Sequence, residues 1–137
     1  MRHLAVWVAL SAAGCIPSEG PMMEPGQDCL DCHAAGEGPP TWTFAGTVFG
    51  AEDAATSDGV RGVTVTVTDR NGKSVTVRSN EAGNFYSAEK LTPPFRASMS
   101  RGGRVETMED TFEYGGCNTC HTWPSLPAYD TGRLQAP

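Results

Sequence analysis

The middle of the chain alternates between apolar and polar residues with a period of two. Residues Val63–Thr68 read Val-Thr-Val-Thr-Val-Thr, so the valines share one face and the threonines share the other. The alternation returns at Ser74–Arg78, after the turn Asp69–Gly72, whose Asn-Gly pair is a strong hairpin signal. The pattern predicts a half-buried antiparallel hairpin.

Shorter apolar stretches surround this hairpin and are separated by turns rich in Gly, Asn and Pro. They predict further strands at Phe44–Phe49, Phe85–Ser87, Phe95–Met99 and Val105–Met108. Short strands at such close and regular spacing predict an all-β fold, a small β-sandwich.

The same region resembles a known domain family. The matching stretches are Ala45–Val48, Gly62–Asp69, Gly72–Lys73 and Asn80–Phe85, and together they resemble a carboxypeptidase-regulatory-like domain. The resemblance covers about residues 44–108 and implies a transthyretin-like, prealbumin-like β-sandwich. It implies little about function, because such domains mostly act as scaffolds.

Two copies of one short pattern flank the predicted strands. Residues Cys29–His33 and Cys117–His121 both read Cys-x-x-Cys-His, the attachment signature of a c-type haem. Two intervening residues let both sulfurs reach one edge of the porphyrin, and the adjacent histidine then lies under the iron. The pattern predicts two c-type haems, bound covalently by Cys29, Cys32, Cys117 and Cys120, with His33 and His121 as proximal iron ligands.

Zinc is the main alternative for these cysteines, since paired Cys-x-x-Cys segments also hold structural zinc. An all-thiolate zinc site would need neither histidine, and it would be unusual in an exported protein. A pair of disulfides is a further alternative. The haem interpretation accounts for both histidines and is preferred.

The second axial ligand of each iron cannot be a spare histidine. His33 and His121 are used as proximal ligands, and the remaining histidine, His3, lies in the segment expected to be removed. Methionine commonly partners histidine in cytochromes c and raises the potential. Met23 and Met108 stand ahead of the two motifs at similar distances, and they are predicted to be the distal ligands, directly or crossed between the two haems.

One motif before a sandwich and one after it resembles the arrangement of small exported dihaem c-type cytochromes. Those proteins also carry a Met-x-Pro-Gly run ahead of the first motif, matched here by Met23–Gly26. Two other methionines receive ordinary roles: Met99 is expected in the core of a strand, and Met22 is expected on the surface.

The amino-terminal stretch looks like a secretory signal. Its apolar run, Leu4–Leu10, is far shorter than the ~20 residues that cross a bilayer. Small residues then lead to Cys15 and resemble the lipobox of bacterial lipoproteins, although Ala12 stands where leucine is usual. The resemblance implies a lipidated Cys15; ordinary cleavage after Ala13, leaving a free thiol, is the alternative.

These observations give a plan of the whole chain. It comprises a lipoprotein signal peptide 1–14, a tether 15–28, a first haem-binding segment 29–41, the sandwich 42–108, and a second haem-binding segment with a tail 109–137. A lipoprotein anchor carries more than one acyl chain, and it therefore binds the membrane more firmly than a single chain would. The predicted location is therefore the periplasm, the outer membrane or the cell surface, with a lipid anchor.

Composition and charge narrow the function. The chain holds 16 glycines and 10 prolines, which argues against a helical bundle, and its net charge of -6 disfavours nucleic acid as a partner. The mature chain has no spare histidine for acid–base catalysis, so an electron carrier is favoured over an enzyme such as a peroxidase. Redox proteins of the cell envelope are the expected partners, and assembly with other cytochromes is left open.

Two other functions remain open on sequence grounds. One is a haem protein that binds or senses a small ligand at a five-coordinate iron, and the other is a structural sandwich with zinc knuckles. The topology adds one expectation to the preferred interpretation. If the first and last strands are neighbours, both motifs meet at one end of the sandwich or along one edge, close enough for rapid electron exchange between two haems.

Overall fold

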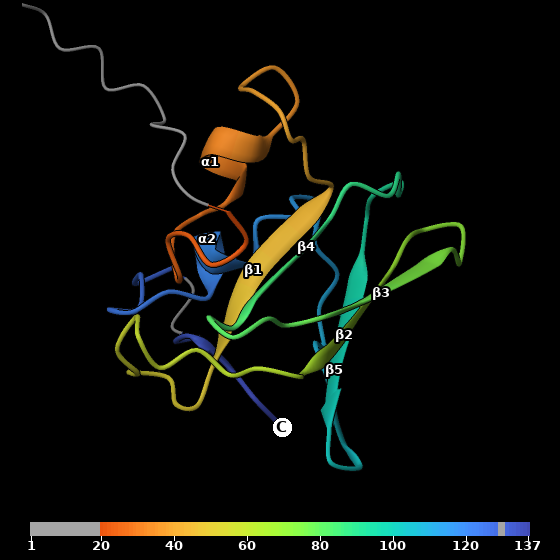
Figure 1. The fold of residues 1–137 in the computed structure, drawn as a ribbon. Helices are drawn as coiled ribbons and strands as arrows, with labels where there is room; N and C mark the ends of the chain where they lie inside the picture. The colour runs from red at the N-terminus through yellow and green to blue at the C-terminus, as the bar shows by residue number, and fades with distance from the viewer. Residues whose placement is uncertain (1–19, 129–130) are drawn as a thin grey trace, which may run out of the picture.

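Two β-sheets face each other in the computed structural model, which describes residues 20–128 and 131–137 (Figure 1). One sheet has the strand order β4-β1-β7, and the other has the order β3-β2-β5-β6. The predicted all-β sandwich is confirmed. The strands are β1 Phe44–Phe49, β2 Thr64–Thr68, β3 Ser74–Arg78, β4 Asn84–Ser87, β5 Arg96–Arg101, β6 Arg104–Thr107 and β7 Leu134–Gln135, and the helices are α1 Leu30–His33 and α2 Cys117–Cys120.

The central hairpin forms as its alternation predicts. Val65 and Val67 of β2 are almost fully buried, at 2% and 0% exposure, while the threonines between them are partly exposed. The turn to β3 is closed by Asp69, whose Oδ1 accepts hydrogen bonds from the backbone N–H groups of Asn71 and Lys73 at 2.8 and 2.9 Å. This Asx-type bonding is the physical reason for the polar turn.

The core lies between the two sheets, where their apolar faces meet. Strand β1 is buried along its whole length, because β4 and β7 flank it and other chain segments cover it. Aromatic and β-branched side chains fill the space between the sheets. The core consists of Phe44, Val48, Val63, Val65, Val67, Phe85 and Phe95.

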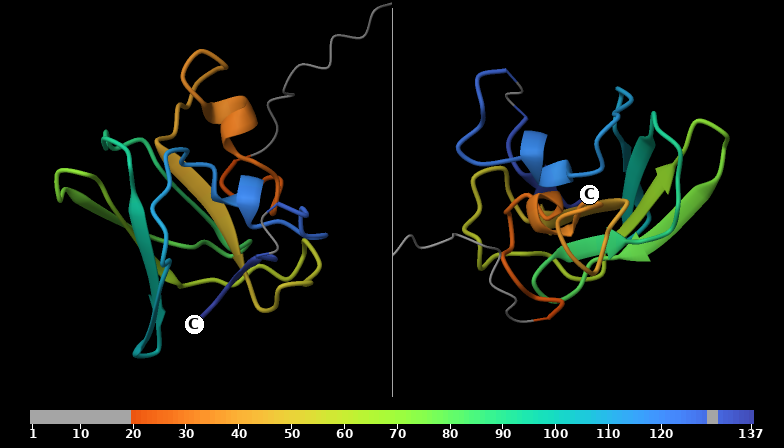
Figure 2. Two further views of the ribbon diagram at one scale, coloured as in Figure 1. Left: turned by 180° about the vertical axis from the view of Figure 1, so that it is seen from behind. Right: turned by 90° about the horizontal axis from the view of Figure 1, so that it is seen from above.

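The carboxyl-terminal tail contributes a strand that the sequence did not predict. Leu134 and Gln135 form β7, which pairs in parallel with Val48 and Phe49 at the end of β1 (Figure 2). A two-residue strand carries no detectable period, so its pairing depends on the free edge of β1. Next to it the Arg133 guanidinium lies 4.2 Å from the centre of the Phe49 ring, a cation–π contact that helps to hold the tail.

The stretch 20–28, expected to be part of an extended tether, lies against the sandwich. The side-chain amide of Asn84 donates to the Met23 carbonyl at 2.8 Å, and the Gly26 N–H donates to the Thr47 hydroxyl at 3.0 Å. These donors and acceptors come from distant strands, so no local period announces the contact. The signal peptide, Cys15 and the rest of the tether lie outside the described residues, and none of the described helices is long and apolar enough to span a membrane.

Candidate functional site

The two Cys-x-x-Cys-His motifs lie side by side at one end of the sandwich. In Figures 1 and 2 the one-turn helices α1 and α2 are neighbours beside β1 in every view. A parallel β-bridge joins Ala45 of β1 to Gly116, the residue just before α2. The expected meeting of the two motifs is therefore present in the fold, although the spacing of two haems stays a prediction.

A glycine in β1 makes room for the second motif. A Cβ atom at Gly46 would lie 2.7 Å from Cζ of Phe85 and 2.8 Å from Cβ of Cys117, closer than such atoms approach in real proteins. Gly46 thus lets α2 dock directly on the strand. A residue with no side chain is required here by a close approach and not by an unusual backbone angle.

Asn118, between the two cysteines of the second motif, anchors both motifs to β1. It is 4% exposed; its Oδ1 accepts from the Thr47 N–H at 3.0 Å, and its Nδ2 donates to the Gln27 carbonyl at 2.7 Å. The network continues through the Thr47 hydroxyl, which donates to Asn84 at 2.8 Å. Sequence reasoning treated residue 118 as a spacer, and no sequence pattern could have revealed its role.

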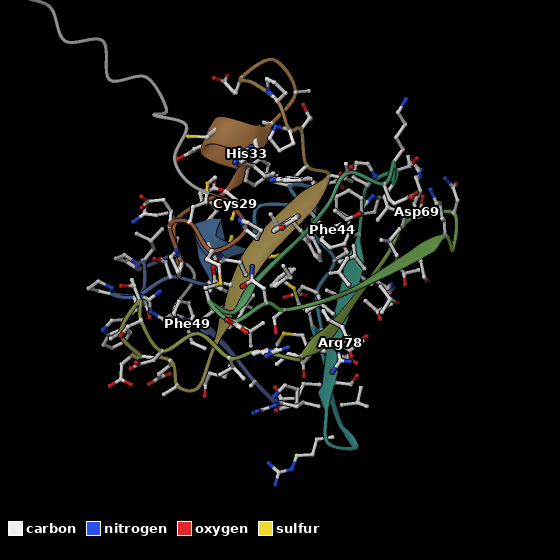
Figure 3. All side chains as sticks on the ribbon, viewed as in Figure 1. Cys29, His33, Phe44, Phe49, Asp69 and Arg78 are labelled. Atoms are coloured by element: carbon white, nitrogen blue, oxygen red, sulfur yellow. The ribbon has the colours of Figure 1, made fainter. Side chains whose placement is uncertain are left out.

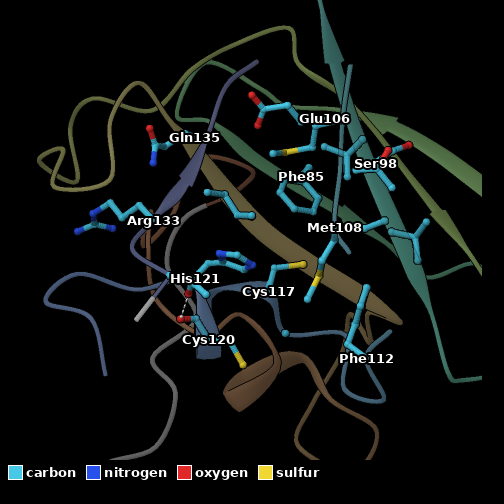
Figure 4. Close-up of a pocket in the computed structure, with 18 of the residues that line it drawn as sticks. Phe85, Ser98, Glu106, Met108, Phe112, Cys117, Cys120, His121, Arg133 and Gln135 are labelled. Carbon is cyan, nitrogen blue, oxygen red and sulfur yellow. Dashed lines mark hydrogen bonds between the residues drawn. The ribbon is translucent and has the colours of Figure 1, made fainter. Parts of the chain in front are cut away.

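A cavity of about 440 Å³ separates α2 from the four-stranded sheet (Figure 4). Cys117, Cys120 and His121 line one side of it, and β2, β5, β6 and the tail supply the other walls. Most of these wall residues are apolar. They include Val65, Val67, Phe85, Ala97, Met99, Met108, Phe112, Leu134 and Ala136.

The cavity contains one of the two predicted distal ligands. Met108, which follows β6 and is 38% exposed, lines the cavity together with His121 (Figure 4). Met99 packs against the core as expected, but it also lines the same cavity. Met23 does not line it, and its backbone is held by Asn84. The structure therefore brings Met108, and not Met23, to the second motif.

Burial favours the neutral form of His121. Its Nδ1 is buried and has no hydrogen-bond partner among the described residues. Burial lowers the pKa of the imidazole below its ordinary value, although the backbone of Gly132 opposes this shift. A neutral imidazole with a buried unpaired nitrogen is the state that a metal-binding histidine requires.

His33 of the first motif is oriented by a backbone carbonyl. Its Nδ1 lies 2.7 Å from the Pro40 oxygen, and within the described part of the chain Nε2 makes no hydrogen bond. Metal-binding histidines commonly hold their second ring nitrogen in this way, which fixes the tautomer and leaves Nε2 for the metal. The Trp42 ring lies 5.7 Å away, centre to centre, and itself stacks on Tyr86 at 4.5 Å.

The thiols of the motifs differ in state. Cys29, Cys117 and Cys120 are free thiols, whereas Cys32 is disulfide-bonded. Burial, assisted by the nearby Asp28 carboxylate, raises the pKa of Cys29 to about 11. Burial together with Cys29 and Asp28 raises the pKa of Cys117 to about 12. A sulfur in a disulfide cannot add to a vinyl group, so Cys32 would have to be a free thiol for covalent attachment at the first motif.

No protein-family model matches this chain, and neither a curated protein nor a solved structure matches it. The likeness to carboxypeptidase-regulatory-like domains and to small dihaem cytochromes therefore rests on the quoted sequence motifs alone. The site itself rests on the placement of the two motifs.

Proposed function

We propose that the protein is a dihaem c-type cytochrome that carries single electrons at the bacterial cell envelope. One observation carries the proposal: two Cys-x-x-Cys-His motifs that are distant in sequence lie side by side, with the second docked on β1 and Asp28 hydrogen-bonded to both helices. A haem supplies a reversible one-electron change at its iron. The protein supplies attachment, axial ligands and a partly apolar surrounding.

The residues around the second motif fit a haem. The walls facing Cys117 and Cys120 are mainly apolar, as the faces of a porphyrin require. Burial favours the neutral form of His121, and its Nδ1 has no hydrogen-bond partner among the described residues. Met108 lines the same cavity and is the proposed distal ligand, with Met99 as the other sulfur in reach of the cavity.

The residues around the first motif also fit a haem, but they would enclose less of its surface. His33 is held at Nδ1 and keeps Nε2 for a metal, while Trp42 and Tyr86 offer aromatic surface beside it. Met23 stays the proposed distal ligand of this site on sequence grounds. An open site with an external ligand would instead match the ligand-binding function.

The zinc alternative needs its ligands to converge on one point. Within residues 20–128 and 131–137, no group of three or more His, Cys, Asp or Glu side chains is placed to hold a metal ion. A c-type haem makes no such demand, because the thiols bond to porphyrin carbons and only the histidine binds the iron. Haem attachment therefore does not require the convergence of ligands that zinc would need.

The remaining parts of the proposal rest on the sequence. We infer a lipid anchor at Cys15, export to the periplasm, outer membrane or cell surface, and other redox proteins of the envelope as partners. No catalytic role is proposed. Replacing Cys15 with serine should release the protein from the membrane fraction without changing its haem content, and membrane retention of that variant would refute the anchor.

The function is tested by producing the full chain in a host with the c-type haem maturation machinery and counting haems in alkaline pyridine. Two covalent haems per chain are expected, and one is expected in each of the double variants Cys29→Ser/Cys32→Ser and Cys117→Ser/Cys120→Ser. A protein that contains zinc or oxidised thiols and no haem would refute the electron-carrier proposal.

A further inference from the structure

Asp28, the residue just before the first motif, contacts both motifs. Its Oδ1 accepts a hydrogen bond from the Leu30 N–H at 3.0 Å, at the start of α1. Its Oδ2 accepts hydrogen bonds from the hydroxyl groups of Thr119, inside α2, and of Tyr114, the latter at 3.1 Å. One carboxylate thus joins two helices that lie far apart in the sequence.

The second motif leaves space for this carboxylate. A Cβ atom at Gly116 would lie 2.5 Å from Oδ1 of Asp28, so a larger residue there would displace this carboxylate. The position of the Asp28 carboxylate thus depends on the residue next to α2. This dependence indicates that Asp28 helps to dock the two motifs on each other.

The charge of Asp28 reaches both motifs and has no partner cation among the residues that the structure describes. After burial, it is a cause of the raised pKa of Cys29 and of Cys117, the first cysteine of each motif. The ion pairs formed by the described residues are Arg61–Glu81 and Lys73–Glu89, so neither includes Asp28. An uncompensated negative charge in a partly buried place acts over a longer range than one in water.

We propose that Asp28 is a positioning residue shared by the two haem sites: it latches α1 to α2, and its carboxylate lowers the reduction potentials of both irons. The inference rests on the proposed function. Its physical basis is that oxidised iron carries one more positive charge than reduced iron, so a nearby negative charge stabilises the oxidised form. Since one side chain lies against both motifs, removing its charge should act on both potentials.

The test is a spectroelectrochemical titration of the full dihaem protein and of Asp28→Asn, a substitution that keeps an acceptor oxygen and removes the charge. Both midpoint potentials are expected to move in the positive direction. The matched control is Asp31→Asn, which removes an exposed charge of α1 that makes no hydrogen bond to α2. The control should shift mainly the potential of the first haem.

A second pair of variants separates the latch from the charge. The double variant Tyr114→Phe/Thr119→Val removes both hydroxyl donors and keeps the carboxylate, so it should alter the Soret circular dichroism that reports inter-haem geometry while the potentials stay low. Asp28→Glu keeps the charge, so both of its midpoint potentials should stay close to those of the parent. This variant can be measured even if Asp28→Asn fails to fold.

The outcomes distinguish this inference from the proposed function. If the parent protein contains no haem, the cytochrome proposal is refuted, and the role of Asp28 is refuted with it. Two haems whose potentials are unmoved in Asp28→Asn, or only one of which moves, would overturn the shared role of Asp28 and leave the cytochrome intact. An equal positive shift in Tyr114→Phe/Thr119→Val would assign the effect to geometry and overturn the role of the charge.

Discussion

The same five-residue motif occupies two different surroundings in this molecule. Around α2 the chain builds a mostly apolar cavity of about 440 Å³ between the motif and a sheet. Each helix has one buried residue, Leu30 in α1 and Asn118 in α2, but α1 also carries the exposed Asp31. Figure 3 shows His33 on α1, beside one end of β1. The second motif therefore borders an apolar cavity of the sandwich, whereas the first motif exposes a charged residue to solvent.

This difference should make the two haems unequal. An apolar surrounding disfavours the extra positive charge of oxidised iron, and a methionine ligand raises the potential further. The second site has both features in its cavity. We expect the second haem to have the higher potential and the first haem, which is more exposed, to exchange electrons more readily with partners.

The largest expected effect comes from removing one attachment at a time. Cys117→Ser/Cys120→Ser leaves the cavity of the sandwich unfilled, so the unfolding free energy should fall by about 2–5 kcal/mol, the scale of a large-to-small core substitution. Cys29→Ser/Cys32→Ser should cost less. Denaturant unfolding of the two single-haem proteins compares the stability that each site loses. An equal loss in both would contradict the difference between the two sites.

Substitution of the methionines tests which sulfur is the distal ligand of the second haem. Replacing Met108 with leucine should abolish the weak long-wavelength band of sulfur-bound ferric iron at the second haem and lower the potential of that haem. Met99→Leu, at the same cavity, is the matched control and should keep the band. Retention of the band in Met108→Leu together with its loss in Met99→Leu would transfer the ligand role to Met99.

Met23→Leu asks the same question of the first site. If Met23 is the distal ligand there, the variant should lose the sulfur band of the first haem alone and leave that of the second haem unchanged. An unaltered absorption spectrum would mean that the first iron takes its second ligand from elsewhere.

A smaller effect is expected from the amide that docks the second motif. Asn118→Leu leaves the buried Thr47 N–H without its partner, at a cost of roughly 1–3 kcal/mol. The Gln27 carbonyl also loses its donor, but Gln27 is exposed and water can replace it. Unfolding measured by denaturant should show this loss. Asn71→Leu, in the exposed β2–β3 turn, is the control and should change stability much less.

The smallest effect concerns the thiols of the haem-free protein. Because the pKa of Cys117 is raised to about 12 and that of Cys29 to about 11, alkylation of both should be slow at pH 8 and increase about tenfold per pH unit. The increase should level off near pH 11 for Cys29 and continue towards pH 12 for Cys117. Peptide mapping after alkylation measures both rates, and faster alkylation of Cys117 than of Cys29 would contradict the deeper burial of the second site.

The same shifts predict how stability depends on pH without haem. Each folded-state thiol pKa lies above its ordinary value of 9.0, so the protonated thiol is favoured in the folded protein. The resulting stabilisation is complete below pH 9 and is lost as the pH rises towards 11–12. The thermal unfolding midpoint of the haem-free protein should therefore fall as the pH rises across this range. In Cys117→Ser, the fall should be smaller.

Local patterns were sufficient for much of this protein. The period-two run at β2, the Asn-Gly turn and the return strand β3 were predicted to within one residue, since a half-buried strand records its two faces in adjacent residues. The two Cys-x-x-Cys-His motifs were equally visible, because their chemistry requires a fixed spacing inside five residues.

Only the tertiary structure decided where these parts meet. Asn118 and Asp28 bond to groups 71 and 91 residues away, β7 exists only because the edge of β1 is free, and the cavity is formed by strands and a tail that share no local pattern. By itself the sequence determined the strands and the two Cys-x-x-Cys-His motifs on which the haem proposal rests, because periodicity and motif spacing are properties of neighbouring residues. The asymmetry of the two sites depends on long-range packing, which no short stretch of sequence contains.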